Sequence, residues 1–444
     1  MLHSISLKNQ DTKKADKTTK AIAKKLLYAI PKTIHHYFPQ FKRYLRQIED
    51  CRKRSEYELS EILTGAISLF LFKEGSRNAF NQDRKDSEFV NNYEKLFGLR
   101  LPHMDTVDDL FRAISPEELE RFKIKLIENL LEKKALHKWR MLGKYFVVAV
   151  DGTGVMSFDK RHCDKCLVKT YESGKKGYFH NVLEAKLVLP NGLAISLATE
   201  WIENDSDNYD KQDCELKAFY RLSEKLKKNF PRLPICIVGD GLYPNQKVFE
   251  ICERNRWEYI ITLKDGNLPS VWEEVKFLSY LQKENRQKVI ALKQKKPTEI
   301  NYRWITGIEY KGHNLNWVQA KEEKKKYIFV TGMKVDKKKA AQIIASGRLR
   351  WKIENKGFNE QKNGGYGLGH KYSEVSLTAA KNYYQSLQIA SIINQLLELG
   401  EKLKERGITI KHIWKNLLAF MLYGKIDEDV IADSLKKRIQ IRLE

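Results

Sequence analysis

The sequence predicts an α/β fold with an inserted β-rich segment, flanked by helical regions at both ends of the chain. Three observations support this prediction. Short apolar runs typical of buried strands alternate with amphipathic stretches between about residues 141 and 279. Polar and apolar residues then alternate at a period of two between 280 and 335. Outside these two ranges, apolar residues recur mainly at three- and four-residue steps, which favours helices.

Length and charge limit the class of protein. A chain of 444 residues is too long for one compact core, so we expect two to four units. A net charge of +24 favours a polyanionic partner, and nucleic acid is the most general one. The alternative is a basic protein from an organism whose coding is rich in Lys. No apolar run reaches the roughly 20 residues of a membrane span, and the basic N-terminus lacks the apolar core of a signal peptide. We therefore expect a cytoplasmic protein with no membrane partner.

The first third of the chain contains two regions. Residues 1–30 are Lys-rich and poor in aromatic residues, which favours a basic, flexible arm able to contact DNA phosphates. Residues 31–140 have helical spacing, and Ser115 followed by Pro116 is a typical helix start. A basic helical module of this size commonly binds DNA and nearly as often serves as a scaffold. We expect a DNA-binding domain here.

The middle of the chain, 141–279, predicts a strand, a hairpin of two strands, a helix, a strand, a helix and a strand. The expected bounds are Tyr145–Val150, Asn181–Leu189, Leu193–Ile202, about Lys211–Asn229, Ile235–Gly239, about Pro244–Asn255 and Tyr259–Leu263. This order of elements is the one found in the ribonuclease-H-like fold. The sequence therefore predicts a ribonuclease-H-like core whose first part ends near residue 279.

Three further regions complete the predicted organisation. The alternating segment 280–335 is expected to form a β-strand insertion, a subdomain placed before the last helix of the core. The region 336–375 is expected to contain one long helix, capped by Asp336 and stopped by Gly364 and Gly365. Residues 376–444 are expected to finish the chain as helices.

Three carboxylates stand where a two-metal site needs them. Asp151 and Asp240 each end an apolar run and precede a glycine, and Gly152 with Thr153 suggests a turn just past the first strand. An Asp in this setting is often only a turn residue. Glu354 follows on a predicted helix. Such carboxylates can converge on two cations about 3.5–4 Å apart, and oxygen ligands favour Mg²⁺ or Mn²⁺ over Zn²⁺.

The predicted helix around Glu354 carries further polar residues. Arg350 and Gln361 lie four residues before and seven residues after Glu354, so all three are expected to share one face. Arg350 is expected to contact a phosphate while Glu354 binds metal. The alternative is a surface Arg–Glu ion pair of little energetic value. Trp351 is expected on the apolar side that seats the helix on the sheet.

A second candidate metal site contains nitrogen and sulfur donors. His162, Cys163 and Cys166 form a CxxC motif with an adjoining histidine, and His180 follows. These side chains could bind a structural zinc. A single CxxC motif without a second pair is equally compatible with two reduced thiols in a loop, and both interpretations stay open.

Three sequence blocks resemble bacterial insertion-sequence transposases of the DDE class, in the branch whose core is interrupted by β-strands before the Glu. They are VAVDGTG, the span KQDCELKAFYRLSEKLKKNFPRLPICIVGDGLYPNQKVFEIC, and GRLRWKIENKGFNEQKNGGYGLGHKYS. The resemblance covers about residues 145–375. It implies that Asp151, Asp240 and Glu354 form the catalytic, metal-binding triad. The branch also has Tyr, Arg, Glu and Lys at set steps: Arg350 and Glu354 fit, Gly347 takes the Tyr step, and Gln361 takes the Lys step with Lys362 one place later.

The resemblance implies a function as well. It predicts metal-dependent cleavage at transposon ends and strand transfer into target DNA, with Mg²⁺ or Mn²⁺ as cofactor. The partners would be terminal inverted repeats and target DNA, bound by a homodimer in a bacterial cytoplasm, at the nucleoid. DNA contacts are expected from Arg350, Lys362, Tyr243, Trp304 and Trp317, the two tryptophans by holding a flipped base; sheet packing is the alternative role for them. The alternative functions are a structure-selective nuclease and a domesticated, non-catalytic DNA-binding protein.

Overall fold

The computed structural model describes the whole chain except residues 1, 206–210, 294–295, 324, 404–408 and 437–444. The chain divides into two compact units. One, the helical unit, consists of Met1–Leu136 together with Asn359–Glu444, and the other, the sheet unit, is His137–Phe358. The N-terminal and C-terminal helical regions, which the sequence suggested as separate parts, therefore form one unit. Among the described residues, no helix is long and apolar enough to span a membrane.

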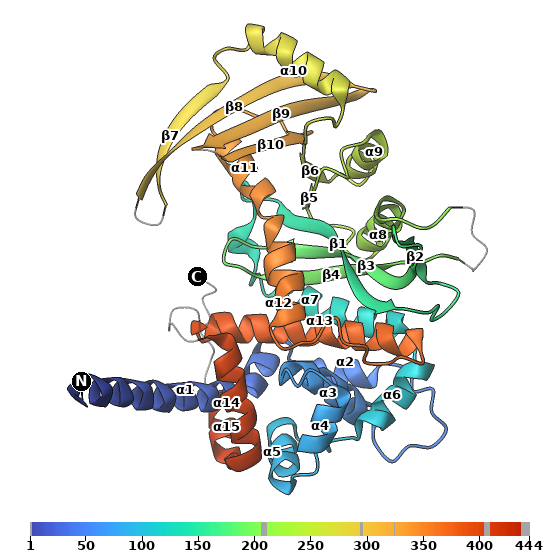
Figure 1. Ribbon diagram of the computed structural model, residues 1–444, viewed down its shortest axis with the longest axis vertical. Coiled ribbons are helices and arrows are strands. Elements are labelled where there is room, and N and C mark those ends of the chain that lie inside the picture. The colour runs from blue at the N-terminus through green and yellow to red at the C-terminus, as the bar shows by residue number, and fades with distance from the viewer. Residues whose placement is uncertain (1, 206–210, 294–295, 324, 404–408, 437–444) are drawn as a thin grey trace. The chain divides into compact units, whose positions relative to one another are not determined.

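The helical unit is organised around α13, which packs against α1, α3, α6 and α7 (Figure 1). Every residue of α3 is buried, as expected for a helix enclosed by others. The helices of this unit are α1 (Leu2–Tyr37), α2 (Phe41–Arg46), α3 (Leu59–Leu71), α4 (Arg77–Asp83), α5 (Ser87–Phe97), α6 (Met104–Ala113), α7 (Pro116–Glu132), α12 (Asn359–Asn363), α13 (Leu377–Gly400), α14 (Ile410–Tyr423) and α15 (Glu428–Lys436). The C-terminal helices predicted for 376–444 are thus present, except that 404–408 and 437–444 lie outside the described residues.

The N-terminal segment is a helix and not the flexible arm expected for residues 1–30. Its buried side chains include Ile22, Leu26 and Ile30, which recur every four residues along one face. This face packs against α13, α14 and α15. The high Lys content of the segment suggested disorder, but Lys17, Lys20, Lys24 and Lys25 are exposed beside this buried face, as in an amphipathic helix.

The sheet unit contains one ten-stranded sheet with the order β2-β3-β1-β5-β6-β10-β9-β8-β7, and β4 also pairs with β3. β1, β5 and β6 are parallel neighbours, and the other pairings are antiparallel. The strands are β1 (Phe146–Phe158), β2 (Leu167–Thr170), β3 (Lys176–Val188), β4 (Ala194–Ile202), β5 (Ile235–Gly239), β6 (Glu258–Thr262), β7 (Arg286–Lys293), β8 (Lys296–Tyr310), β9 (His313–Glu322) and β10 (Lys325–Thr331).

Helices connect and cover this sheet. They are the short 3-10 turn η1 (His137–Trp139), α8 (Glu215–Asn229), α9 (Gln246–Arg254), α10 (Pro269–Leu281), α11 (Ala340–Arg348) and the π-helix η2 (Ile353–Phe358). α8 packs on β3 and β4, whereas α11 packs on β6, β8, β9 and β10. The predicted order of strand, hairpin, helix, strand, helix and strand corresponds to β1, β3 and β4, α8, β5, α9 and β6.

The β-rich segment 280–335 continues the central sheet and does not form a sheet of its own. β10 pairs antiparallel with β6, with Phe329 opposite Thr262 and Val330 opposite Ile261. β9, β8 and β7 then follow outward in the same sheet, as Figure 1 shows. The sequence pattern predicted strands here, but alternation alone does not indicate which edge a new strand joins.

Candidate functional site

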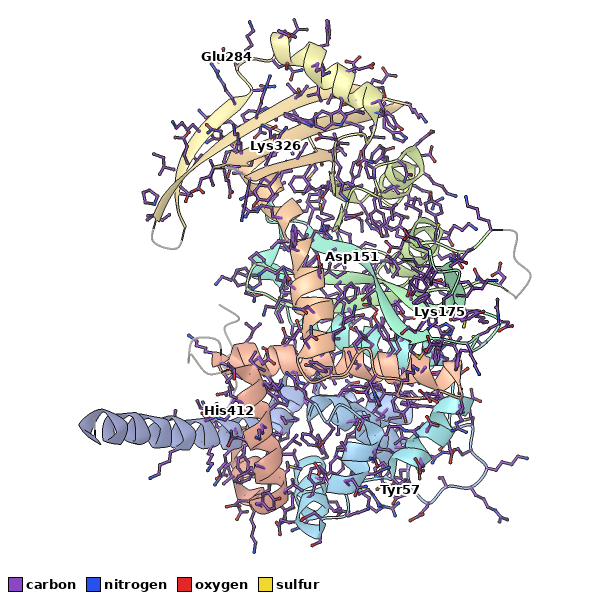
Figure 2. All side chains as sticks on the ribbon, in the orientation of Figure 1. Tyr57, Asp151, Lys175, Glu284, Lys326 and His412 are labelled. Atoms are coloured by element: carbon purple, nitrogen blue, oxygen red, sulfur yellow. The ribbon has the colours of Figure 1, made fainter. Side chains whose placement is uncertain are left out.

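Asp151 and Asp240 lie side by side just beyond the point where the parallel pairing of β1 and β5 ends. In the register of β1 and β5, Phe146 is opposite Ile235 and Ala149 is opposite Val238. Two residues further along, this register brings Asp151 beside Asp240, on neighbouring strands about 4.8 Å apart. The two side chains are 24% and 32% exposed, so both are accessible from solvent. Figure 2 labels Asp151 on β1.

The chain does not turn at Gly152 and Thr153, as the sequence suggested. β1 continues to Phe158, with Gly152 opposite Leu183 and Thr153 opposite Val182 on β3. Pairing with β3 therefore overrides the local turn preference of an Asp-Gly sequence. The glycine has a different role, because a Cβ added at Gly152 would lie 2.7 Å from Cδ of Glu215. The missing side chain makes room for another carboxylate.

Glu354 lies in the π-helix η2, which packs against β1, β3 and β4. Its side chain is exposed, while Ile353 and Phe358 are buried and hold the segment on the sheet. The negative charge of Glu354 contributes to raising the pKa of Asp151, so the two carboxylates are electrostatically coupled. The three carboxylates predicted from the sequence thus belong to one region of the sheet unit.

The single long helix predicted for this region is interrupted. α11 ends at Arg348, a turn follows, and the π-helix then replaces α-helical spacing around Glu354. A π turn takes one residue more than an α turn, and such turns are frequent at functional sites. Positions counted at 3.6 residues per turn from Glu354 are therefore displaced beyond Phe358.

Gln361 and Lys362 belong to α12 in the helical unit. Gln361 is buried and donates from Nε2 to Oε1 of Gln388 at 2.9 Å. Its predicted place on one face with Glu354 is therefore wrong, because the π turn breaks the periodicity on which it depended. Lys362 is exposed, and its expected DNA contact stays a prediction.

Arg350 forms an ion pair with Asp151, with Nη1 3.3 Å from Oδ2. The alternative interpretation was an ion pair between Arg350 and Glu354, and it assumed an uninterrupted α-helix. Burial raises the pKa of Asp151, the Arg350 guanidinium lowers it, and the charges of Asp240 and Glu354 raise it further, so that the pKa lies above its ordinary value. Such crowding of like charges is what a cation would relieve. Lys264 Nζ lies 3.6 Å from Asp240 Oδ2 on the other side of the pair.

Glu215 is a fourth carboxylate at this place, and the sequence analysis did not identify it. It lies in the first turn of α8 against Gly152. Burial raises its pKa most, followed by the charges of Asp151 and Asp240, while the neighbouring Tyr243 hydroxyl lowers it. An acidic residue opening the helix between the hairpin and β5 was the available signal, but it resembles an ordinary helix-start residue.

The aromatic residues expected to contact DNA are buried. Tyr243 is 1% exposed, with its ring against Phe219 at 5.4 Å between centroids. Trp304 and Trp317 are 5% and 3% exposed, and Trp317 packs edge-on against Trp272. Contacts of these three side chains with DNA stay predictions, and the burial of Trp304 and Trp317 agrees with the alternative role, sheet packing. The two tryptophans fill the core because alternate residues of β8 and β9 face helices that cover the sheet.

Trp351 is exposed instead of seating its helix on the sheet. Its side chain is 55% exposed and lies beside Arg350, whose guanidinium carbon is 5.5 Å from the ring centroid. Both residues line a cavity of about 520 Å³ that also includes Asp240. The cations on its lining are Lys264, Lys326, Arg348 and Arg350. Basic and aromatic side chains therefore surround the carboxylate at this opening.

The four nitrogen and sulfur donors predicted from the sequence also come together. The ligand atoms of His162, Cys163, Cys166 and His180 all lie within 4.8 Å of one another, and Cys166 and His180 are buried. This group, called here the His–Cys cluster, lies in the sheet unit on the loop that follows β1 and on β3.

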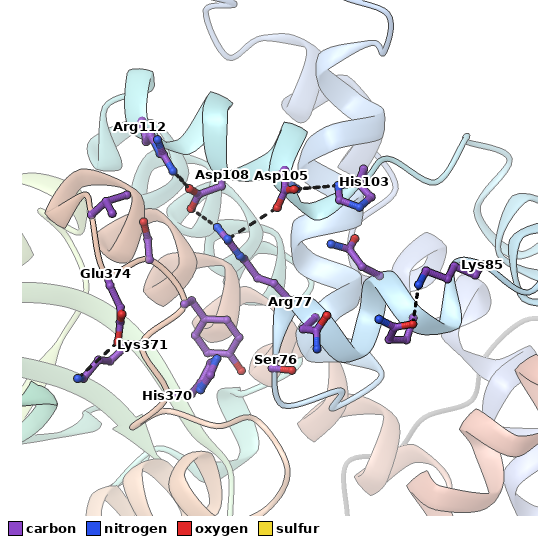
Figure 3. Close-up of a pocket in the computed structure, with 16 residues that line it drawn as sticks. Ser76, Arg77, Lys85, His103, Asp105, Asp108, Arg112, His370, Lys371 and Glu374 are labelled. Carbon is purple, nitrogen blue, oxygen red and sulfur yellow. Dashed lines mark hydrogen bonds and ion pairs between the residues drawn. The ribbon is translucent and has the colours of Figure 1, made fainter.

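A larger cavity, of about 860 Å³, lies within the helical unit (Figure 3). Its charged groups neutralise one another: Asp108 forms ion pairs with Arg77 and Arg112, each with a nitrogen–oxygen distance of 2.6 Å. His103 lies 3.4 Å from Asp105. Because Asp108 is shared between two guanidinium groups, the lining has the character of a structural ion-pair network and not of a metal site.

Comparison with known proteins identifies a similar solved structure and no family. No protein-family model matches the chain, and no curated protein matches it. Among solved structures, the chain is similar to a piggyBac transposase in a synaptic complex with hairpin DNA. The similarity has a TM-score of 0.40 at 10% sequence identity, and it covers 95% of this chain and 83% of that one.

Proposed function

We propose that the protein is a divalent-metal-dependent DNA transposase, in which Asp151, Asp240 and Glu354 form the catalytic centre. The observation that carries the proposal is the register of β1 and β5, which brings the two aspartates side by side, with the charge of Glu354 acting on Asp151. The sequence blocks that resemble DDE transposases contain the same three residues. The order of elements from β1 to β6 agrees with the ribonuclease-H-like core that this class requires.

The donor set fits Mg²⁺ or Mn²⁺. All the candidate ligand atoms here are carboxylate oxygens, which these hard cations prefer. Asp151 and Asp240 would hold a cation between them, and Glu354 would complete the site from η2. Two bound cations would stabilise the charge on the attacking and leaving oxygens of a phosphodiester.

The surrounding cations and Trp351 suit a DNA strand. Arg350 would exchange part of its contact with Asp151 for a phosphate, since guanidinium groups bind phosphates in two-pronged geometry. Lys264 and Lys326 line the same cavity and would neutralise further phosphates. Trp351 takes the role first assigned to Trp304 and Trp317, because an exposed indole can stack on an unpaired base. Binding should weaken steeply with salt.

The proposal extends to transposition itself. The protein would cut at terminal inverted repeats and join the freed 3′ end to target DNA, in the bacterial cytoplasm at the nucleoid. Since two ends must be joined, a homodimer on DNA is expected. A structure-selective nuclease would share the metal site but lack strand transfer, so a joining assay separates the two. A domesticated DNA-binding protein would fail to bind Mn²⁺ in a calorimetric titration.

The test uses the full-length protein and a labelled duplex carrying the sequence found at the ends of the element that contains the gene. Cleavage in Mg²⁺ is measured for the wild type, for Glu354→Gln, and for Glu274→Gln as a matched control on the exposed face of α10. We expect Glu354→Gln to lose about 10³-fold or more in rate, because several kcal/mol of transition-state stabilisation depend on the metal site. The control should cleave normally. Equal cleavage by both variants would remove Glu354 from the centre.

A further inference from the structure

We propose that the His–Cys cluster, His162, Cys163, Cys166 and His180, binds a structural Zn²⁺ ion. The proposal does not depend on the carboxylate centre, because it concerns different side chains with different donor atoms. It rests on the spacing of the donor atoms, on the elements they join, and on the hydrogen bonds around them.

The donor spacings match a tetrahedron around zinc. Cys163 Sγ lies 3.9 Å from Cys166 Sγ, and the two sulfurs lie 3.5 and 3.4 Å from His180 Nε2. A tetrahedral zinc with bonds of about 2.3 Å to sulfur and about 2.05 Å to nitrogen separates two sulfurs by about 3.8 Å and a sulfur from a nitrogen by about 3.6 Å. These three distances therefore agree with a single ion at the centre of the cluster.

The cluster joins a loop to a strand of the sheet. Cys163 and Cys166 lie in the polar loop between β1 and β2, while His180 is on β3 opposite Met156 of β1. His162 stacks on Phe158 at the end of β1, with centroids 4.4 Å apart and rings 8° from parallel. An ion shared by these side chains would fasten the loop to β3, at the point where β2 begins to pair.

The chemistry selects zinc and a structural role. Two thiolates and two imidazoles in a tetrahedron are typical of Zn²⁺, whereas Mg²⁺ avoids such donors. Four protein ligands also leave no open position for a water or substrate, which a catalytic zinc requires. A disulfide between Cys163 and Cys166 would join the two sulfurs but would give His162 and His180 no reason to converge on them.

Hydrogen bonds connect the cluster to the start of α8. Asn204 Nδ2 donates to the carbonyl of Cys166 at 2.8 Å, and the backbone N–H of Asp213 donates to Asn204 Oδ1 at 3.1 Å. Asp213 stands two residues before Glu215. The ion would therefore stabilise the loop that contains Cys166. Through Asn204, this loop holds the segment just before α8, where Glu215 lies.

The experiment measures metal content by mass spectrometry in full-length protein purified without chelator. We expect one zinc per chain in the wild type and in Cys51→Ser/Cys214→Ser, which alters the two exposed cysteines. Cys163→Ser and His162→Ala should each bind zinc at least about tenfold more weakly. Asp151→Asn/Asp240→Asn should keep its zinc, which separates this site from the carboxylate centre.

A second measurement uses the wild-type protein, so that the test does not depend on the folding of the variants. Wild-type protein exchanged with Co²⁺ should show the strong visible absorption of tetrahedral cobalt bound by thiolates, and a chelator should lower its Tm. Reduced wild-type protein that binds no zinc when refolded with the metal would overturn the proposal. So would loss of zinc from the Asp151→Asn/Asp240→Asn variant with retention in Cys163→Ser.

Discussion

The guanidinium of Arg350 lies against Asp151, with Nη1 3.3 Å from Oδ2, although Glu354 is the carboxylate four residues away on the same segment. The arginine thus neutralises part of the negative charge of Asp151. Substitutions of Arg350 can separate its effect on the pKa of Asp151 from its proposed effect on DNA binding.

Replacing Arg350 should impair both DNA binding and the acid side of the pH profile. Arg350 lowers the pKa of Asp151, so in Arg350→Ala this pKa should rise and the acid limb of the rate profile should move to higher pH. We expect a loss of roughly 10–100-fold in kcat/KM, the effect of about 1.4–2.8 kcal/mol. Arg350→Lys should restore the pH profile more fully than the rate, since ammonium lacks the fork geometry. An unchanged pH limb in Arg350→Ala would contradict this prediction.

Neutralising Asp151 should stabilise the metal-free protein while abolishing cleavage. The pKa of Asp151 is raised by burial and by Asp240 and Glu354, so the folded state disfavours the ionised form. The cost is present above the raised pKa, and it disappears as pH falls toward the ordinary value of 3.8. At pH 7.5 Asp151→Asn should therefore have the higher Tm, and the difference should shrink as pH falls below the raised pKa.

Adding a divalent cation should stabilise the wild type but not Asp151→Asn. A cation at about 100 times its Kd stabilises a folded protein by about 2.7 kcal/mol. Mn²⁺ should raise the Tm of the wild type by the corresponding amount and leave that of Asp151→Asn nearly unchanged. An equal rise in both proteins would show that the cation binds elsewhere.

Glu215 should contribute to cation binding without being essential to the fold. Its carboxylate lies against Gly152 and its pKa is raised by the charges of Asp151 and Asp240. We expect Glu215→Gln to weaken Mn²⁺ binding about tenfold, as is typical of groups that support a metal site. Calorimetric titration measures this, with Glu224→Gln on the same helix as the control. Equal affinities for the two variants would exclude Glu215 from the site.

Gly152 should be required because of Glu215. An added Cβ would lie 2.7 Å from Glu215 Cδ, so Gly152→Ala must displace that side chain. We expect a loss of roughly 1–3 kcal/mol in unfolding free energy, the usual cost of overpacking. In the Glu215→Ala background the same change should cost much less, and urea unfolding of the four proteins gives the coupling. Additive losses would refute the contact.

In the helical unit, Lys73 and Glu398 form a buried pair. Lys73 Nζ lies 3.4 Å from Glu398 Oε1 and 4.0 Å from the ring centroid of Trp414, and the two charged side chains are 3% and 6% exposed. Lys73→Met should cost about 3–5 kcal/mol by leaving a buried carboxylate without its cation. Adding Glu398→Gln should recover part of this loss in urea unfolding. A double variant no more stable than Lys73→Met would contradict the assignment.

The sequence predicted which helices and strands exist better than it predicted where they begin and end. That Asp151 and Asp240 follow neighbouring runs of strand residues could be predicted, because apolar runs are local signals. The extension of β1 past Gly152 was missed, since cross-strand pairing is not visible in one strand. Gln361 was wrongly placed on one face with Glu354, because the spacing of apolar residues does not reveal the extra residue of a π turn. Glu215 escaped notice because its importance arises only when α8 packs on the sheet beside Gly152.

The continuity of the sheet also bears on how far the chain can be shortened. β6 pairs with β5 on one side and with β10 on the other. Removing residues 286–331 would leave the outer backbone groups of β6 without partners, next to the strand that leads to Asp240. Open edges of this kind invite pairing with other chains. The inserted strands therefore satisfy the outer backbone groups of β6 and leave β7 as the last strand on this side of the sheet.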